Sequence, residues 1–200
     1  MEKELVVAYY NEDLNWLNNH KDYKISIYNK SNNEIENTVK LTNIGRETHT
    51  YFNHIINNYD NLSDWTFFTQ ANPFDHVLDY EVILKDYPNF SVYNKLKVGD
   101  ECFFFSNGVD FKKSIVGRSD GSPYHWEKLN VNSIWEKIFI NSPPPFYNFT
   151  KGAIFTISKN QIKIRSLEFY EKCLNCSIQR ESAPWEMERI IPYIFNPEFK

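Results

Sequence analysis

Glycine is scarce in this sequence, with six residues in 200, and no glycine-rich phosphate-binding motif is present. The pattern G-x-x-x-x-G-K-[S/T] of P-loop nucleotide hydrolases does not occur. The pattern G-x-G-x-x-G of dinucleotide-binding domains and protein kinases is also missing. The sequence therefore does not indicate any of these common classes of nucleotide-binding enzyme.

A long hydrophobic run and an even number of cysteines are missing as well. The apolar run near the start, residues 5–10, is too short for a signal-peptide core or a membrane-spanning helix. The three cysteines are Cys102, Cys173 and Cys176, and an odd number without a secretory signal is typical of reduced thiols. We therefore expect a soluble, cytoplasmic protein without a membrane span, located in the host cytoplasm if it is a viral protein.

An excess of positive charge is absent too. The 22 basic and 26 acidic residues are mixed along the chain and leave a net charge of −4, which argues against nucleic acid as a partner. Aromatic residues make up 17% of the chain, enough to fill the core of one domain of 200 residues. No repeat or long linker divides the sequence, so residues 1–200 are expected to form a single domain.

Short apolar strands alternate with amphipathic helices in the first 70 residues. Strands are predicted at residues 4–10, 24–29 and 65–69, and helices at residues 12–20, capped by Asn11, and 47–59. This rhythm predicts an α/β fold with a mostly parallel, Rossmann-like sheet flanked by helices. Later strands are predicted at 101–106 and 152–158, and later helices at 77–85, 126–140, 159–175 and from Pro184 onward, with a loop at 107–125.

Polar residues follow each of the first three predicted strands. They are Asn11 and Glu12 after the first strand, Lys30 after the second, and the stretch from Gln70 to His76 after the third. Ligands of open α/β sheets bind beyond the carboxyl ends of the strands, so the three groups predict one shared site. Each group also has a simpler explanation, since Asn11 suits a helix cap and Lys30 suits a solvated loop.

Two further groups carry possible chemistry. Gly45, Arg46 and Glu47 precede a predicted helix, where free backbone N–H groups and a guanidinium suit a phosphate, although an ion pair would also explain Arg46. Asp75 and His76 stand together after a strand, and such a pair can bind a divalent metal or a sugar hydroxyl.

Several segments resemble an uncharacterised family whose members occur in fungi, algae, plants, bacteria and large DNA viruses. The segments read VVAYYNEDLNWL, NIGRETHTYFNHIINNYDNLSDWTFFTQANPFDH, GAIFTISKNQI with FYEK, and EMERIIPYIF. The N-x-G-R-E motif at residues 43–47, with the aromatic strand after it, is the most specific part. That family in turn resembles divergent GT-A glycosyltransferases, which implies a GT-A-like fold.

The resemblance implies a glycosyltransferase that moves a sugar from a nucleotide diphosphate sugar to a carbohydrate or protein hydroxyl. Its partners would be this nucleotide sugar and a glycan acceptor. Asn11, Glu12 and Lys30 would contact the nucleoside, Arg46 would pair with the diphosphate, and Gln70 would lie at the same edge.

The resemblance also implies a catalytic carboxylate in the last helix, at Glu188 or Glu186. These residues are two apart and point about 200° away from each other on a helix, so only one can face the sheet. The family-like pattern favours Glu188, and His76 is a further candidate. An ion pair with Arg165, Arg180 or Arg189 is the alternative role for either glutamate.

The Asp-x-Asp metal motif of most GT-A enzymes is missing after the third strand. Three outcomes are open: Asp75 and His76 hold Mn²⁺ or Mg²⁺, no metal is used, or transferase activity is lost. Two other functions also stay open. One is a non-catalytic carbohydrate-binding protein that stacks sugars on aromatic residues in 65–74 and 124–126. The other is a metal-dependent hydrolase that uses Asp75 and His76.

Overall fold

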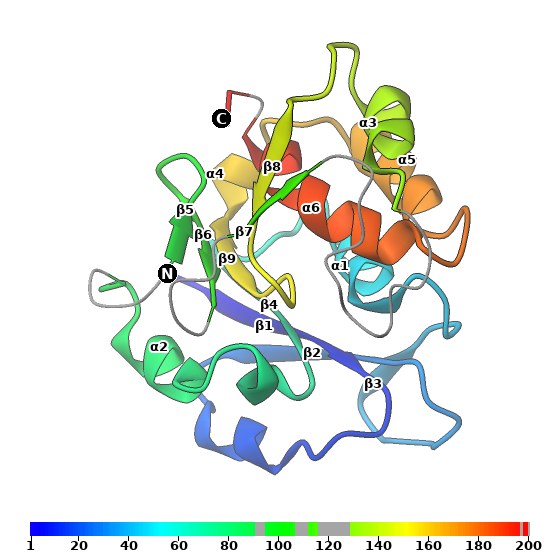
Figure 1. Ribbon diagram of the computed structural model, residues 1–200. Coiled ribbons are helices and arrows are strands. Elements are labelled where there is room, and N and C mark those ends of the chain that lie inside the picture. Colours follow the sequence, from blue (N-terminus) through cyan, green and yellow to red (C-terminus); the bar gives the residue numbers. More distant parts are fainter. Residues whose placement is uncertain (91–94, 107–111, 116–128, 197, 200) are drawn as a thin grey trace.

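The computed structural model describes residues 1–90, 95–106, 112–115, 129–196 and 198–199. Its centre is a seven-stranded sheet in the order β3-β2-β1-β4-β9-β6-β5 (Figure 1). The strands are β1 (Lys3–Tyr9), β2 (Lys24–Asn29), β3 (Thr38–Lys40), β4 (Trp65–Gln70), β5 (Lys95–Lys97), β6 (Cys102–Phe105) and β9 (Phe155–Ser158). Strands β7 (Lys112–Ile115) and β8 (Phe146–Phe149) form a separate antiparallel pair.

The sheet is mixed, with a parallel half and an antiparallel half. Strand β1 runs parallel to both β2 and β4, and β3 runs parallel to β2. Strand β9 pairs with β4 and β6 in antiparallel fashion, as β5 does with β6. The predicted α/β sheet with flanking helices is confirmed, but the expectation that it is mostly parallel holds only for β1 to β4.

Both faces of the sheet are buried, because successive side chains of a strand point to opposite faces. Phe68 belongs to the core on one face and its neighbour Phe67 to the core on the other. In the same way, Val6 and Val7 of β1 lie in different cores. This double burial explains why the strands read as continuous apolar runs.

Helices cover the two faces unequally (Figure 1). The larger core contains residues of α1 (Arg46–Asn57), α3 (Val131–Ile138), α5 (Leu167–Ser177) and α6 (Ala183–Phe195). The smaller core contains residues of the 3-10 helix η1 (Asn15–Asn19) and of α2 (Tyr80–Asp86). Two short elements, η2 (Pro73–Asp75) and α4 (Lys159–Ile162), follow β4 and β9. None of the described helices is both long and apolar enough to span a bilayer.

Two helix predictions need correction. Asn11 caps no helix, because η1 begins only at Asn15, whose backbone N–H is bound by the carboxylate of Asp13 at 2.9 Å. The helix predicted at 159–175 is two helices, α4 and α5, because the Ser166 side chain accepts a hydrogen bond from the backbone of Phe169 and starts a new helix. The last helix, α6, begins at Ala183, close to the predicted start at Pro184, and runs through Pro192 to Phe195.

Candidate ligand-binding site at the switch point of the sheet

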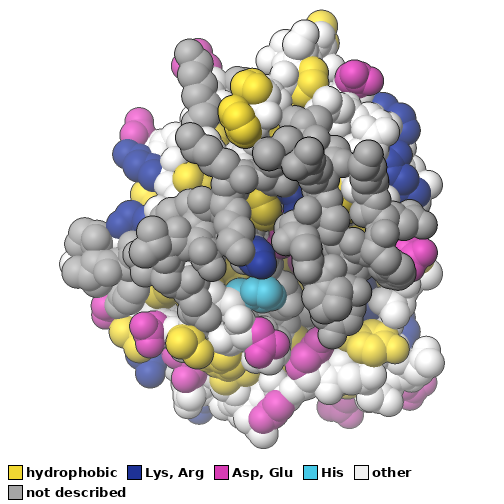
Figure 2. All heavy atoms as spheres, in the orientation of Figure 1, with side chains coloured by type: hydrophobic (Ala, Val, Ile, Leu, Met, Phe, Trp, Pro, Cys, Tyr) yellow, Lys and Arg dark blue, Asp and Glu magenta, His cyan; other side chains and the backbone are white. Residues whose placement is uncertain are grey.

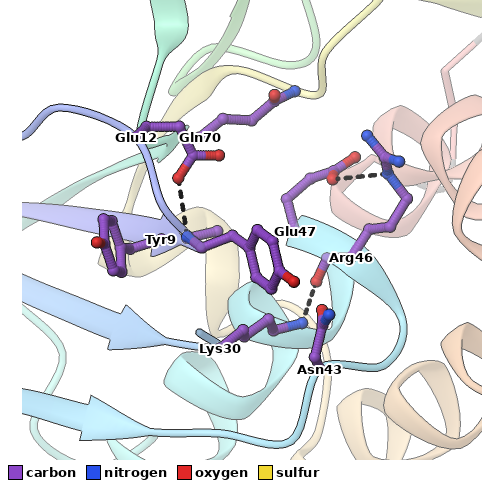
Figure 3. A pocket seen from close by; sticks show the side chains of 9 residues that line it. Tyr9, Glu12, Lys30, Asn43, Arg46, Glu47 and Gln70 are labelled. Carbon is purple, nitrogen blue, oxygen red and sulfur yellow. Dashed lines mark hydrogen bonds and ion pairs between the residues drawn. The ribbon is translucent and has the colours of Figure 1, made fainter. Parts of the chain in front are cut away.

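A cavity of about 290 Å³ lies beyond the carboxyl ends of the parallel strands. From β1 the chain builds β2 and β3 on one side and then returns to place β4 on the other, so the strand order reverses between β1 and β4. Ligands of open α/β sheets bind at such a switch point. The cavity is lined by Ala8, Tyr9, Tyr10, Glu12, Lys30, Asn43, Arg46, Glu47 and Gln70 (Figure 3).

The structure thus brings together four of the residues predicted to contact the ligand, and they come from separate segments. They are Glu12, Lys30, Arg46 and Gln70. Glu12 and Gln70 lie on one side of the cavity, and Arg46 lies on the other with Glu47 (Figure 3). The carboxylate of Glu12 accepts hydrogen bonds from the backbone N–H groups of Tyr10 and Asn11, at 2.8 and 3.0 Å. These bonds hold the turn after β1 in place.

Asn11 is the predicted nucleoside contact that does not line the cavity. Its side chain is exposed, and its amide oxygen accepts a hydrogen bond from the Asn33 side chain at 3.0 Å. Asn11 therefore joins two loops at the edge of the site.

Lys30 braces the turn that leads into α1. Its ammonium group donates hydrogen bonds to the carbonyl oxygen of Ile44, at 2.7 Å, and to that of Arg46 (Figure 3). Burial lowers the pKa of Lys30 to about 8, with a smaller effect from the charge of Arg46, while Glu47 raises it. The structure therefore gives Lys30 a positioning role, since it ties the end of β2 to the N-x-G-R-E motif.

The start of α1 has an unusual backbone. Gly45 and Arg46 both have left-handed conformations, with φ of 63° and 48°. A Cβ atom on Gly45 would lie 2.7 Å from Cβ of His49 and 2.8 Å from Cγ2 of Ile178, so this position requires glycine. A non-glycine residue such as Arg46 in this region is strained, and strain of this kind clusters at functional sites.

The first turn of α1 also keeps backbone donors available. No side chain caps this helix end. The first N–H groups of a helix have no partner within the helix, and with the helix dipole they favour an anion. The start of α1 therefore adds positive potential where Arg46 and Glu47 line the cavity.

Arg46 has two neighbours and is still accessible. Its Nε lies 3.5 Å from a carboxylate oxygen of Glu47, and its guanidinium lies over the Trp185 ring at 5.1 Å from the centroid. The Arg46 side chain is 54% exposed. A guanidinium in this setting can exchange the single carboxylate contact for a bidentate contact with a ligand oxyanion.

Glu188 and His76 do not line the cavity, but both lie at a backbone turn that contacts the lining residue Gln70. The Gln70 side chain donates to the carbonyl oxygen of Gly152 at 3.0 Å, and the Gly152 N–H donates to Oε1 of Glu188 at 2.6 Å. A Cβ on Gly152 would come within 2.6 Å of the ring of His76. Gly152 therefore links the cavity residue Gln70 to both predicted catalytic residues.

Burial favours the neutral form of His76. Burial lowers its pKa, whereas the carboxylates of Glu47 and Asp75 raise it by a smaller amount. In the view of Figure 2, a histidine and a basic side chain lie near the centre, and acidic side chains lie below them. A neutral imidazole can accept a proton or bind a metal.

Glu186 lies in a different environment from Glu188. It is fully buried, and its carboxylate accepts hydrogen bonds from Nη2 of Arg180 at 2.6 Å and from the backbone N–H of Asn130 at 2.6 Å. Glu186 does not line the cavity. These contacts match the ion-pair alternative that the sequence left open for this residue.

The described residues near this site include few side chains that could hold a metal. No three His, Cys, Asp or Glu side chains gather in the described part of the chain. Asp75 is exposed at the end of η2, and His76 follows it. This pair offers at most two ligands, so a bound Mg²⁺ or Mn²⁺ would need phosphate oxygens and water for the others, as is common for Mg²⁺.

The aromatic residues predicted to stack on sugars are engaged in packing. Trp65 stacks on Phe103, with ring centroids 6.4 Å apart, and Phe74 packs edge-on against Trp16 at 5.8 Å. The second predicted aromatic segment, 124–126, lies outside the described residues.

The contacts of Gly152 and Trp185 with the residues of the site were not predicted from the sequence. Gly152 is a lone glycine before an apolar strand, and Trp185 is one turn before Glu188 in α6, and neither pattern indicates a contact with the site.

No curated protein and no solved structure matches this chain. The family described as "Protein of unknown function (DUF3431)" matches residues 5–200, and the chain belongs to this family.

Proposed function

We propose that this protein is a GT-A-like glycosyltransferase that uses a nucleotide diphosphate sugar as its donor. The observation that carries the proposal is the position of the cavity at the switch point between β1 and β4, with Arg46 and the start of α1 beside it. The strand order 3-2-1-4 is that of nucleotide-binding doubly wound sheets, in which the phosphates lie at a helix N-terminus.

Residues on the two sides of the cavity suit the two parts of such a donor. Arg46 and the first N–H groups of α1 would bind the diphosphate, because a guanidinium makes bidentate contacts with phosphate oxygens. Glu12 and Tyr10, which follow β1 and line the cavity, would contact the nucleoside, as the resemblance to GT-A enzymes implies for the polar turn after the first strand. Lys30 would act indirectly by holding the turn that carries Arg46.

Transfer would need a base for the acceptor hydroxyl. In this reaction a bond forms between the acceptor oxygen and C1 of the sugar, while the bond between C1 and the diphosphate oxygen breaks. The proton of the acceptor would pass to Glu188 or to His76. Both lie at Gly152, whose carbonyl oxygen contacts the cavity residue Gln70. A positioned base typically contributes about 10²–10⁴-fold to the rate. Arg46 would stabilise the negative charge of the departing diphosphate.

A divalent metal is compatible with this proposal. Asp75 and His76 would hold it together with the diphosphate, and when bound it would neutralise charge on the leaving group. If no metal is used, Arg46 and the start of α1 would have to supply this charge stabilisation.

The proposal is tested by thermal denaturation and calorimetric titration with uridine and guanosine diphosphates and their sugars, with and without Mn²⁺. A ligand at a hundred times its dissociation constant adds about 2.7 kcal/mol to the free energy of unfolding. We expect a clear increase in Tm for at least one nucleotide, followed by transfer of its sugar to an oligosaccharide acceptor. Binding of free glycans without any response to nucleotides would instead favour a non-catalytic carbohydrate-binding protein.

Arg46→Lys provides a sharper test, because lysine keeps the charge but lacks the planar fork. We expect weaker nucleotide binding and an unchanged Tm of the free protein. Arg165→Lys is the matched control, since Arg165 also lies over an aromatic ring, Phe169, but outside the cavity. A loss of stability in Arg46→Lys with unchanged nucleotide affinity would contradict the proposed diphosphate contact.

A further inference from the structure

A second cavity, of about 410 Å³, lies next to the first. It is bounded on one side by residues 43–46 and on the other by the connection between α5 and α6 and the start of α6. Asn43 and Arg46 line both cavities, so the turn before α1 forms the wall between them.

The wall opposite this turn is built around Arg180 and Trp185. The Nε and Nη2 atoms of Arg180 bind one carboxylate oxygen of the buried Glu186 at 3.0 and 2.6 Å, and Nη2 also donates to the carbonyl oxygen of Asn130 at 3.1 Å. These bonds fix the orientation of the guanidinium, while the side chain remains 32% exposed. Trp185 is half-buried and lies against Arg46.

The charges around this cavity are nearly balanced. Arg46 is accompanied by Glu47 and Arg180 by Glu186, and the exposed Glu181 adds one more negative charge. These side chains include one carboxylate more than guanidinium groups, and this excess of negative charge repels a phosphate or another strong anion. The balance therefore favours a neutral ligand with many hydrogen-bonding groups.

We propose that this second cavity binds a neutral saccharide. An indole ring offers an apolar surface to the C–H face of a sugar ring, while the guanidinium of Arg180, the carboxylate of Glu181 and the amide of Asn43 offer donors and acceptors for its hydroxyls. An apolar wall with a few fixed polar groups is the usual composition of a small-molecule site.

The position of this cavity relates it to Glu188. Trp185 and Glu188 are three residues apart on α6, so they lie on the same face of the helix. A glycan that rests on Trp185 can therefore extend toward Glu188. Binding of a saccharide here does not depend on the nucleotide site, and only its role as the acceptor rests on the proposed function.

The test uses saturation-transfer NMR on the full chain with unlabelled lactose, maltotriose, cellotriose, chitotriose and xylotriose as probes. We expect at least one of them to bind, and Trp185→Ala to weaken that binding by about tenfold or more. Phe146→Ala is the control, because Phe146 is an exposed aromatic residue that does not line the cavity. Absence of binding by every probe at millimolar concentrations, or binding that Trp185→Ala leaves unchanged, overturns the inference.

Two further measurements keep the outcome decisive. Glu181→Ala changes an exposed side chain and should fold normally, so it tests the same site if Trp185→Ala is unstable. It should also weaken saccharide binding, and if Trp185→Ala is unstable, unchanged binding in Glu181→Ala contradicts the site. Saccharide binding in a protein that fails to bind any nucleotide would refute the proposed function and leave this inference intact.

Discussion

The backbone N–H of Gly152 donates a hydrogen bond of 2.6 Å to the carboxylate of Glu188. Gly152 has a φ of 86°, and this left-handed turn before β9 brings its N–H to α6 and its carbonyl oxygen to Gln70. Oε2 of Glu188 also lies 3.4 Å from Nη1 of the buried Arg189. The carboxylate is thus oriented from two sides, and Gly152 connects it to the cavity residue Gln70.

Glu188→Gln is expected to abolish glycosyl transfer while nucleotide binding survives. Glutamine keeps an oxygen that can accept from Gly152, so the local structure should persist, but its amide cannot take a proton from an acceptor. The measurements are transfer rate, nucleotide affinity and Tm. Full activity in this variant would eliminate Glu188 as the base and leave His76 as the next candidate.

Glu186→Gln is the matched comparison, and we expect it to act on stability instead. It leaves the guanidinium of Arg180 without its carboxylate partner in a largely buried place. Removing one member of a buried pair costs about 3–5 kcal/mol, and the partial exposure of Arg180 places the expected loss at or below the lower limit. Urea denaturation measures it. An unchanged free energy of unfolding would show that the pair contributes nothing.

Lys30→Met is expected to lower stability and to weaken nucleotide binding together. The substitution removes the hydrogen bonds to the carbonyl oxygens of Ile44 and Arg46 but keeps much of the side-chain volume. Hydrogen bonds from charged groups contribute about 1.5–3 kcal/mol to the free energy of unfolding. Part of this loss is offset, because the variant no longer buries a charge. Lys21→Met, at an exposed position, is the control. Weaker binding with an unchanged Tm would instead mean that Lys30 contacts the ligand directly.

Gly45→Ala is expected to destabilise the protein more than Gly99→Ala. Both glycines have a positive φ, so both substitutions carry a similar backbone cost. At Gly45 the added Cβ also meets Cβ of His49 and the Ile178 side chain at less than 3 Å, whereas at Gly99 it meets only the flexible Gln161 side chain. The difference in Tm between the two variants measures this packing conflict. Equal losses would show that the turn can move away from α5.

The parallel half of the fold could be predicted from the sequence, and the antiparallel half could not. Strands β1, β2 and β4 are short apolar segments separated by helical segments, and that alternation implies parallel pairing. Strand β9 is also a short apolar segment, but it is buried on both faces. Such a strand carries no pattern that reveals its direction or its place between β4 and β6.

The same distinction applies to the site. Glu12, Lys30 and Gln70 could be predicted because each follows a strand of the parallel half, and such positions meet at one edge. The contacts of Gly152 with Glu188 and His76 could not be predicted, because they join distant segments of the chain through backbone geometry. The hydrogen bonds from Lys30 to the carbonyl oxygens of Ile44 and Arg46 could not be predicted for the same reason.

His49, which packs against the turn at the start of α1, should make the free energy of unfolding depend on pH. It is buried, and its Nδ1 has no hydrogen-bond partner among the described residues. Burial, and to a smaller extent the charge of Lys30, lowers the pKa of His49 from 6.5 to about 4. His49 is therefore neutral in the folded protein at pH values at which the unfolded chain is already protonated.

The free energy of unfolding should consequently fall as the pH decreases from 6.5 to 4, because the unfolded chain binds a proton that the folded protein excludes. The difference between a pKa of 6.5 in the unfolded chain and about 4 in the folded protein corresponds to at most about 3 kcal/mol of the free energy of unfolding. In His49→Gln this contribution is absent, so urea denaturation across this range should give a flatter profile. Asn57→Ala, an exposed and non-titrating change in α1, should give a profile parallel to that of the unmodified protein. Parallel profiles for all three proteins would mean that His49 titrates normally and that the turn over it opens readily to water.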